Sequence, residues 1–258
     1  MEIKPAIDRA REIYRAKDEK HWQELSKIIN DYEIPLSELL INFPAFVRRR
    51  DLTRILSDYD LFKMVINLPG SIVELGSYLG AGLFTWAKLL ETFAPGDRSR
   101  KVYGFESGKG YEKISSEDGM PQLWIKSVVG EKKISDEYLR RMVNLTNDDN
   151  LIPGAERCIL KTGDILKTVP DFALNNQGTR ISLLFLDVNL FEPTMIGLMH
   201  LYPLVVVGGV IVLNGYGAPP WQGEALAFEK FFRDNGGSIP EVQKFPFSIR
   251  PGAFFIKE

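Results

Sequence analysis

The chain has 258 residues, which suits one large α/β domain or a domain of about 200 residues with a helical extension. Hydrophobic residues make up 45% and charged residues 26%, a composition that excludes disordered and fibrous proteins. The 32 basic and 34 acidic side chains give a formal net charge of -2, and nucleic acid is not expected as a partner because phosphate binding needs a basic surface.

Targeting signals are not evident in the sequence. Residues 1–20 mix charges without an apolar stretch, so no signal peptide is predicted and a cytoplasmic location is expected. The longest apolar run, residues 201–213, contains Pro203, Gly208 and Gly209 and is shorter than the ~20 residues that cross a bilayer, so no membrane partner is expected. The single cysteine, Cys158, begins an apolar run and is predicted to be buried in a strand rather than to act as a catalytic thiol.

Helices are predicted in the N-terminal part of the chain. Apolar residues recur at helical spacing from residue 3 to 29 among many charges, which predicts an amphipathic surface helix followed by a second one. Residues 34–67 are expected to form short helices, with Pro35, Pro44 and Pro69 separating them. Residues 1–68 are therefore predicted to be a helical extension or cap.

A sheet is predicted after Gly70, where short apolar runs alternate with amphipathic segments in a βαβ pattern. A helix is expected at residues 82–92, and the last two strands are expected to close the sheet as an antiparallel hairpin. The strands are predicted at residues 71–75, 101–105, 158–161, 181–187, 209–213, 242–247 and 253–257. The fold class is α/β, a doubly wound and mostly parallel seven-stranded sheet in a Rossmann-like domain at residues 69–258.

The segment from residue 107 to 156 is too long for a simple connection between adjacent strands. Segments of this length often form lids or binding loops, so this one is predicted to cover the site. Within it a helix is expected from Ser135, its N-cap, to Leu145, with Asp136 and Glu137 in the first turn.

A glycine-rich turn follows the first predicted strand, in Val73-Glu74-Leu75-Gly76-Ser77-Tyr78-Leu79-Gly80-Ala81-Gly82. Glycine lets the backbone approach a ligand closely, and ligands of open α/β sheets lie at the carboxyl ends of strands. The spacing of Gly76, Gly80 and Gly82 differs from that of dinucleotide enzymes, and Glu74 would repel a pyrophosphate. The turn is predicted to hold a cationic or hydroxyl-bearing ligand, with a plain strand-to-helix turn as the alternative.

Two further acidic residues follow predicted strands. Glu106, after the second strand, is a candidate acceptor for both hydroxyls of a ribose, and Asp164, after the third, is a candidate acceptor for an adenine amino group. Each of them alone would also suit an ordinary exposed strand end. Together with Glu74 they put acids at the ends of three successive strands, which favours a nucleoside site.

This combination resembles the S-adenosylmethionine-dependent methyltransferases, and in detail the macrocin-type O-methyltransferases that act on deoxysugar hydroxyls of antibiotics. The resemblance begins near Phe43-Pro44 and Arg49 and ends near Phe232, roughly three quarters of the chain. Its motifs are Pro69-Gly70-Ser71-Ile72-Val73-Glu74-Leu75-Gly76, Leu186-Asp187-Val188-Asn189-Leu190-Phe191-Glu192-Pro193-Thr194, Leu201-Tyr202-Pro203, Gly208-Gly209-Val210-Ile211, and Tyr216-Gly217 with Trp221 and Gly223.

The resemblance implies a class I methyltransferase fold, S-adenosylmethionine as donor, a hydroxyl of a sugar or other natural-product intermediate as acceptor, magnesium as cofactor, and a homodimer or larger homo-oligomer. The predicted function is methyl transfer to a hydroxyl group of a small molecule. The predicted donor-binding residues are Glu74, Leu75, Gly76, Ser77, Gly80, Gly82, Glu106, Ser107, Gly163, Asp164, Ile165 and Asp187.

The sequence departs from the family at the metal site. The family's Asp-Gly-Asp after the fourth strand is Asp187-Val188-Asn189 here, and its two adjacent aspartates after the fifth strand are replaced by Asn214-Gly215. Hard divalent cations prefer anionic oxygens, so Asp187 and Asn214, the only candidate ligands, form a weak cage and a Mg²⁺ requirement stays open. Without a metal Asp187 is the best candidate base, and Asn189 and Asn214 would orient hydroxyls.

Several nearby residues allow both a functional and a structural interpretation. His200 and Glu224 are alternative bases, although His200 lies in an apolar helical run and Glu224 opens a helix. Trp221 and Tyr216 suit either pocket walls or the core.

Two other functions compete with methyl transfer. A non-catalytic protein that binds S-adenosylmethionine would keep the donor site and lack the transfer chemistry. A nicotinamide-dependent oxidoreductase conflicts with the glycine spacing.

Overall fold

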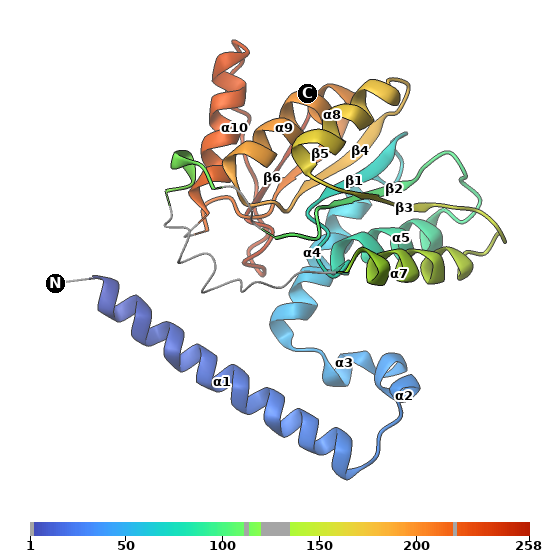
Figure 1. Ribbon diagram of the computed structural model, residues 1–258, viewed down its shortest axis with the longest axis vertical. Coiled ribbons are helices and arrows are strands. Elements are labelled where there is room, and N and C mark those ends of the chain that lie inside the picture. Colours follow the sequence, from blue (N-terminus) through green and yellow to red (C-terminus); the bar gives the residue numbers. More distant parts are fainter. Residues whose placement is uncertain (1–2, 111–113, 120–134, 219–220) are drawn as a thin grey trace. The chain divides into compact units, whose positions relative to one another are not determined.

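The computed structural model describes residues 3–110, 114–119, 135–218 and 221–258. Contacts divide the chain into two compact units, residues 1–52 and 53–258 (Figure 1). Among the helices of the described residues, none is both long and apolar enough to cross a bilayer.

The first unit is helical. Helix α1 spans Ile3–Asp31, α2 spans Leu36–Ile41 and α3 spans Phe43–Phe46. The expectation of two helices between residues 3 and 29 is wrong, because α1 is one helix of 29 residues. The only proline in it, Pro5, lies in the first turn, where proline is tolerated, and no glycine follows to interrupt it.

The second unit contains a six-stranded sheet in the order β3-β2-β1-β4-β5-β6. Its strands are β1 Ser71–Leu75, β2 Val102–Glu106, β3 Cys158–Thr162, β4 Ile181–Leu186, β5 Val205–Leu213 and β6 Ala253–Ile256. Strands β1 to β5 pair in parallel, and β6 is antiparallel to β5. This confirms the doubly wound, mostly parallel α/β fold, and Cys158 is buried in β3 as predicted.

Helices cover both faces of the sheet (Figure 1). On one face lie α5 (Ala81–Phe93), α7 (Asp136–Asp148) and the part of α4 (Arg49–Val65) that belongs to the second unit. On the other lie α8 (Ile165–Asn175), α9 (Phe191–Leu201) and α10 (Gln222–Asp234). The expected boundary at residue 69 follows the start of the sheet, whereas contacts group residues 53–68 with it because Leu61, Phe62 and Val65 of α4 are buried.

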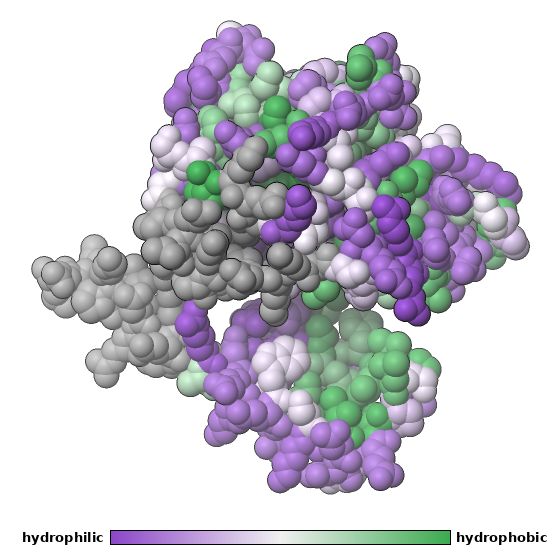
Figure 2. Space-filling model, viewed as in Figure 1, coloured by the Kyte–Doolittle hydropathy of each residue, from purple (hydrophilic) through white to green (hydrophobic). Residues whose placement is uncertain are grey.

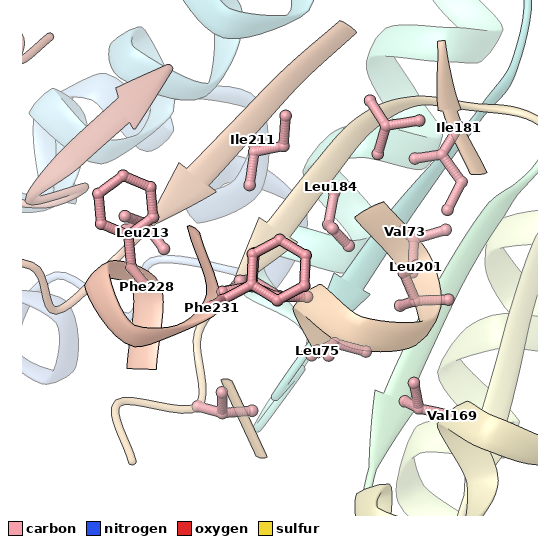
Figure 3. Packing of buried hydrophobic residues seen from close by; sticks show 14 of the residues in the cluster. Val73, Leu75, Val169, Ile181, Leu184, Leu201, Ile211, Leu213, Phe228 and Phe231 are labelled. Atoms are coloured by element: carbon pink, nitrogen blue, oxygen red, sulfur yellow. The ribbon is translucent and has the colours of Figure 1, made fainter. Parts of the chain in front are cut away.

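Side chains of β1 alternate between the two faces. Val73 and Leu75 join Leu201 of α9 and Phe228 of α10 in the cluster drawn in Figure 3. Glu74 lies between them in sequence, and its side chain is therefore directed to the opposite face, where α5 packs.

The predicted seventh strand is not formed among the described residues. Within residues 242–247 only Gln243 makes an isolated antiparallel bridge to Phe254, through two backbone hydrogen bonds of 2.7 and 2.9 Å. Pro246 lacks the N–H that a longer ladder would need. Phe245 nevertheless stacks on Phe254 at 5.0 Å between ring centroids, so the segment packs on β6 without extending the sheet.

The predicted lid, residues 107–156, lies partly outside the described residues. Its described parts include a short 3-10 helix, η1 (Ser116–Asp118), and α7. Ser135 caps α7 as predicted, because its hydroxyl accepts a hydrogen bond from the Glu137 N–H at 3.2 Å. A second 3-10 helix, η2 (Tyr202–Leu204), connects α9 to β5.

Candidate active site

The carboxyl ends of β1, β4 and β5 bring Gly76, Asp187 and Asn214 side by side. Asp187 N–H donates to the Leu75 carbonyl at 2.8 Å, and Asn214 N–H donates to the Leu186 carbonyl at 3.0 Å, so parallel pairing continues one residue past the strands. A Cβ on Gly76, whose φ is +87°, would lie 2.3 Å from the Asp187 carbonyl oxygen. Only glycine fits so close to the neighbouring strand end.

The three predicted catalytic residues form one hydrogen-bonded cluster. Asn214 Nδ2 donates to Asp187 Oδ1 at 2.5 Å, and Asn189 Nδ2 lies 3.5 Å from the same oxygen. Both asparagines are buried, whereas the Asp187 side chain is 24% exposed. The amides therefore orient the carboxylate, and Asp187 is the member of the cluster that an acceptor can reach.

Arg54 of α4 also reaches this cluster. Its Nη1 lies 3.7 Å from Asp187 Oδ2 and donates to Asn214 Oδ1 at 3.3 Å. Its Nε donates to both carboxylate oxygens of Asp58, at 2.9 and 3.1 Å, and its guanidinium lies 4.6 Å from the centroid of the Phe185 ring. Sequence reasoning missed Arg54, since its only signal is an Arg-x-x-x-Asp spacing that many exposed helices share.

Burial and neighbouring charges shift the pKa values of Arg54 and Asp58 in opposite directions. Burial disfavours the charge of Arg54, but Asp58, Asp187 and Glu74 outweigh it, so the pKa of Arg54 is raised above its ordinary value. Burial raises the pKa of Asp58 to about 7, against the opposing effect of Arg54. The guanidinium is thus a permanent cation held beside Asp187.

Glu74 fixes the start of α5 against β1. Its Oε2 accepts a hydrogen bond from Trp86 Nε1 at 2.8 Å and lies 2.0 Å from where a Cβ on Gly82 would be. Burial raises the pKa of Glu74 to about 8, and the side chain is only 2% exposed. The predicted contact of Glu74 with a ligand stays a prediction, because its carboxyl group here faces α5.

Glu106 connects the glycine turn to the loop after β2. Its two carboxylate oxygens accept hydrogen bonds from Tyr78 N–H at 2.6 Å and Gly108 N–H at 2.9 Å. The turn needs unusual backbone angles, since φ is +46° at Tyr78 and +87° at Gly80. A carboxylate has about four lone-pair sites, so Glu106 can still accept hydrogen bonds from a ribose.

Other predicted donor-binding residues lie on the same sheet edge. Gly163 and Asp164 follow β3, where Asp164 also caps α8 by accepting from Leu166 N–H at 3.0 Å. Ser77 is buried, and its hydroxyl has no hydrogen-bond partner within the part of the chain that the structure describes. The half-buried Ser107 and Ile165 flank these residues, and Leu75 is buried beneath them.

The two alternative bases are poorly placed for catalysis, since Glu224 is fully buried and His200 lies far from Asp187. Glu224 is fully buried, its Oε2 accepts from Gly215 N–H at 2.6 Å, and burial raises its pKa well above the ordinary value. Glu224 therefore holds the backbone of Gly215, the residue after Asn214. His200 is in the last turn of α9, a helix that starts near Asp187 and runs back along the sheet, so it lies at the far end.

The two candidate wall aromatics belong to the core. Trp221 is 7% exposed, and Tyr216 packs edge-on against Phe228 at 5.8 Å between ring centroids.

The magnesium that the family resemblance implies does not suit this group of residues. Among the described residues, no cluster of three or more His, Cys, Asp or Glu side chains could hold a metal. Asn214 directs its N–H groups to Asp187, and Arg54 already contacts Asp187 Oδ2 and Asn214 Oδ1. The oxygens that would face a divalent cation therefore face a guanidinium.

Comparisons with known proteins find O-methyltransferases of the same fold. Two structures of CalS11, titled as a calicheamicin methyltransferase and as a TDP-rhamnose 3'-O-methyltransferase, are 26% identical to the chain with TM-scores of 0.81 and 0.75. They cover 93% of this chain, and 92% and 94% of their own chains are matched. The O-methyltransferase NovP, 22% identical with a TM-score of 0.61 over 79% of each chain, shares the fold. The chain matches no curated protein sequence.

Residues 60–241 match the macrocin-O-methyltransferase (TylF) family. The match begins in α4, ends beyond α10 and contains the glycine turn together with Asp187, Asn189 and Asn214. The chain belongs to the macrocin O-methyltransferase family.

Proposed function

We propose that this S-adenosylmethionine-dependent O-methyltransferase methylates a sugar hydroxyl and that Asp187 is the base. The observation that carries the assignment of the base is the position of Asp187, whose partly exposed carboxylate follows β4 beside Gly76 of the glycine turn. Ligands of this fold bind outside the carboxyl ends of the strands, so the acceptor would meet Asp187 there.

The chemistry requires a proton acceptor and correct alignment. Bound S-adenosylmethionine supplies a methyl group on a positively charged sulfur. The acceptor oxygen forms a bond to the methyl carbon while the methyl–sulfur bond breaks with its electron pair on sulfur. Asp187 Oδ2 takes the hydroxyl proton, while Asn214 and Asn189 hold Oδ1 in place.

The donor is proposed to bind along residues 74–82, with Glu106 accepting from its ribose and residues 163–165 beside its adenine. The Ser77 hydroxyl, which finds no partner among the described residues, supports this placement, because buried polar groups usually have partners and a ligand would supply one. The carboxylate of Glu106, already fixed by two backbone N–H groups, is oriented before any ligand binds.

A nucleoside-diphosphate sugar is proposed as the acceptor. CalS11, 26% identical over 93% of the chain, carries the description TDP-rhamnose 3'-O-methyltransferase. A non-catalytic donor-binding protein is not favoured, because the family consists of O-methyltransferases. The cytoplasmic location, the homo-oligomeric state, the cap at residues 1–68 and the lid at residues 107–156 stay predictions.

Calorimetry with S-adenosylhomocysteine tests the donor site. Glu106→Ala should weaken binding by about 1 to 3 kcal/mol, the range for hydrogen bonds to a charged group. Glu117→Ala is the matched control, since that carboxylate is exposed and should leave affinity unchanged. Absence of binding to the wild-type protein would remove the donor site from the proposal.

The base is tested with TDP-rhamnose as acceptor. Asp187→Asn should retain donor binding and lose methyl transfer by about 100-fold or more, the usual contribution of a positioned general base. A variant that still turns over at the wild-type rate shows that another group takes the proton.

A further inference from the structure

We propose that the guanidinium of Arg54 takes the place of the divalent cation at the Asp187 and Asn214 site, so that methyl transfer by this chain needs no metal. The inference deepens the proposed function and rests on it. It assigns a positioning role to a residue on α4, outside the motifs of the sheet.

Arg54 places its positive charge beside both candidate metal ligands. Arg54 Nη1 lies 3.7 Å from Asp187 Oδ2 and 3.3 Å from Asn214 Oδ1, so one group contacts both candidate metal ligands. Asn214 would present only an amide oxygen to a metal, and its Nδ2 is already bonded to Asp187 Oδ1. A second cation entering between these oxygens would meet a like charge at a few ångströms.

The guanidinium is held in place by Asp58 and Phe185. The single N–H of Arg54 Nε is shared between the two carboxylate oxygens of Asp58, which is 1% exposed, while the ring of Phe185 lies beneath the guanidinium at 4.6 Å. The Ser57 hydroxyl also donates to the Arg54 backbone carbonyl at 2.8 Å. A buried carboxylate and a stacked ring fix a planar guanidinium more firmly than water would.

The residues of the site also differ in charge from the pattern of the family. The replacement of family aspartates by Asn189 and Asn214 removes negative charges, and the carboxylate that remains beside them is Asp187, which needs a positive charge close by. Arg54 supplies that charge. It contacts Asp187 through Oδ2 while the two amides hold Oδ1, so the carboxylate is fixed in place by protein groups alone.

Binding of Mn²⁺, followed by electron paramagnetic resonance with saturating S-adenosylhomocysteine, tests this proposal. The wild-type protein should show no Mn²⁺ at the site at millimolar concentration. Bound Mn²⁺ that disappears in Asp187→Asn overturns the proposal, and this measurement needs no variant of Arg54.

Two matched variants isolate the effect of Arg54. Asn214→Asp adds a carboxylate ligand but keeps the guanidinium. The second variant combines Asn214→Asp with Arg54→Gln and Asp58→Asn. It has the same added ligand but lacks both members of the buried ion pair, and therefore the guanidinium. The second protein should bind Mn²⁺ at least about tenfold more tightly than the first. Equal affinities in the two backgrounds, or no binding in either, overturn the proposal, and a merely structural salt bridge predicts that equality.

A further measurement distinguishes failure of the proposed function from failure of the role of Arg54. S-adenosylhomocysteine binding should persist in the Arg54→Gln/Asp58→Asn protein, which also reports that it is folded. If the wild-type protein does not bind S-adenosylhomocysteine, the proposed function fails whatever the Mn²⁺ result. If it binds the nucleoside and also holds Mn²⁺ at Asp187, the function stands and the role of Arg54 fails.

Discussion

One cation interacts electrostatically with three carboxyl groups at the site. The cation is Arg54, and the carboxyl groups belong to Asp58, Asp187 and Glu74. Burial raises the pKa of Asp58 to about 7 and that of Glu74 to about 8, while Arg54 opposes both shifts. Asp58 and Glu74 therefore bind protons in the folded protein at pH values where an unfolded chain has released them. The stability of the protein is coupled to pH through these buried groups.

Glu74→Gln should flatten the dependence of stability on pH. The pKa of Glu74 is about 8 in the folded protein against an ordinary 4.5, so its contribution is fully present below pH 4.5 and is lost as the pH rises through 8. The slope for one such group is at most about 1.4 kcal/mol per pH unit. Glutamine still accepts from Trp86 Nε1 but does not titrate.

Urea unfolding at pH values from 5 to 8 measures this effect, and the interval from 7 to 8 is the most specific because Asp58 titrates lower. The wild-type free energy of unfolding should fall across that interval more steeply than that of Glu74→Gln. Parallel curves for the two proteins would mean that Glu74 is ionised in the folded state throughout.

Gly82→Ala should destabilise the protein by about 1 to 3 kcal/mol, the range for overpacking a core. The added Cβ would lie 2.0 Å from Glu74 Oε2, which Trp86 holds in place. Alanine ordinarily favours a helix interior by up to about 1 kcal/mol, so the clash must outweigh this gain. Gly96→Ala is the control, because its Cβ would meet nothing within 4 Å. Equal stabilities of the two variants would contradict the packing argument.

At the scale of elements, η1 is attached to the start of α9. Asp118 Oδ1 accepts from Phe191 N–H at 2.7 Å, and Oδ2 accepts from Ser115 N–H at 2.8 Å. Gly223 of α10 leaves room for this carboxylate, since a Cβ there would lie 1.9 Å from Asp118 Oδ1. One buried side chain thus bonds η1 to the start of α9 and packs closely against α10.

Asp118→Ala should lower the free energy of unfolding by about 1 to 3 kcal/mol, because it leaves the N–H groups of Phe191 and Ser115 without an acceptor. Hydrogen exchange at the Phe191 amide should also become faster. Glu117→Ala, a change of the adjacent but exposed acid, should leave both quantities unchanged. Similar effects from the two substitutions would show that Asp118 is not the attachment point.

The sequence was sufficient to predict the central elements. Strands β1 and β4 were predicted within one residue, because their side chains are buried on both faces and leave a clear apolar pattern. The edge strand β3 and helix α5 were also predicted within one residue. The strand-end positions of Asp187 and Asn214 followed from the same runs. Parallel register then placed these residues side by side, which is why the candidate catalytic cluster was also predictable.

Features that depend on tertiary contacts were not predictable. Arg54 and Asp58 form an ordinary i,i+4 pair in sequence, and nothing local indicates that the helix carrying them packs against Phe185. The segment at residues 242–247 has the composition of a strand, yet only Gln243 pairs with β6. Whether an apolar segment at the edge of a sheet extends its ladder is decided by the neighbouring strand and not by its own pattern.

At the scale of the whole molecule, the two units differ in how much apolar surface they bury. On the first unit, Leu36, Leu40 and Ile41 of α2 are each at least 66% exposed, and Figure 2 shows hydrophobic side chains gathered over α2 and α3. The second unit has apolar clusters on both faces of its sheet. The second unit therefore has the core that independent folding requires.

A chain of residues 53–258 should fold and bind S-adenosylhomocysteine, whereas a chain of residues 69–258 should not. The shorter chain lacks Leu61, Phe62 and Val65, which are at most 1% exposed and pack with Trp86 and neighbouring strands. Loss of a single such side chain commonly removes about 2 to 5 kcal/mol, roughly a third of the stability of a typical domain.

Circular dichroism melting curves and calorimetry on the two truncated chains provide the measurement. Cooperative unfolding of the 69–258 chain would show that the sheet does not depend on α4. Loss of folding in the 53–258 chain would show that the second unit needs residues 1–52.

The guanidinium beside Asp187 is covalently part of the polypeptide, so every folded molecule carries it at fixed stoichiometry. The acceptor proposed above, a nucleotide sugar, bears a diphosphate that binds Mg²⁺ in solution. An enzyme that had to bind Mg²⁺ from solution would compete with such an acceptor for the ion as the acceptor accumulated. A side-chain cation is not subject to this competition. The fraction of protein molecules that carry the positive charge at the site then depends on folding alone.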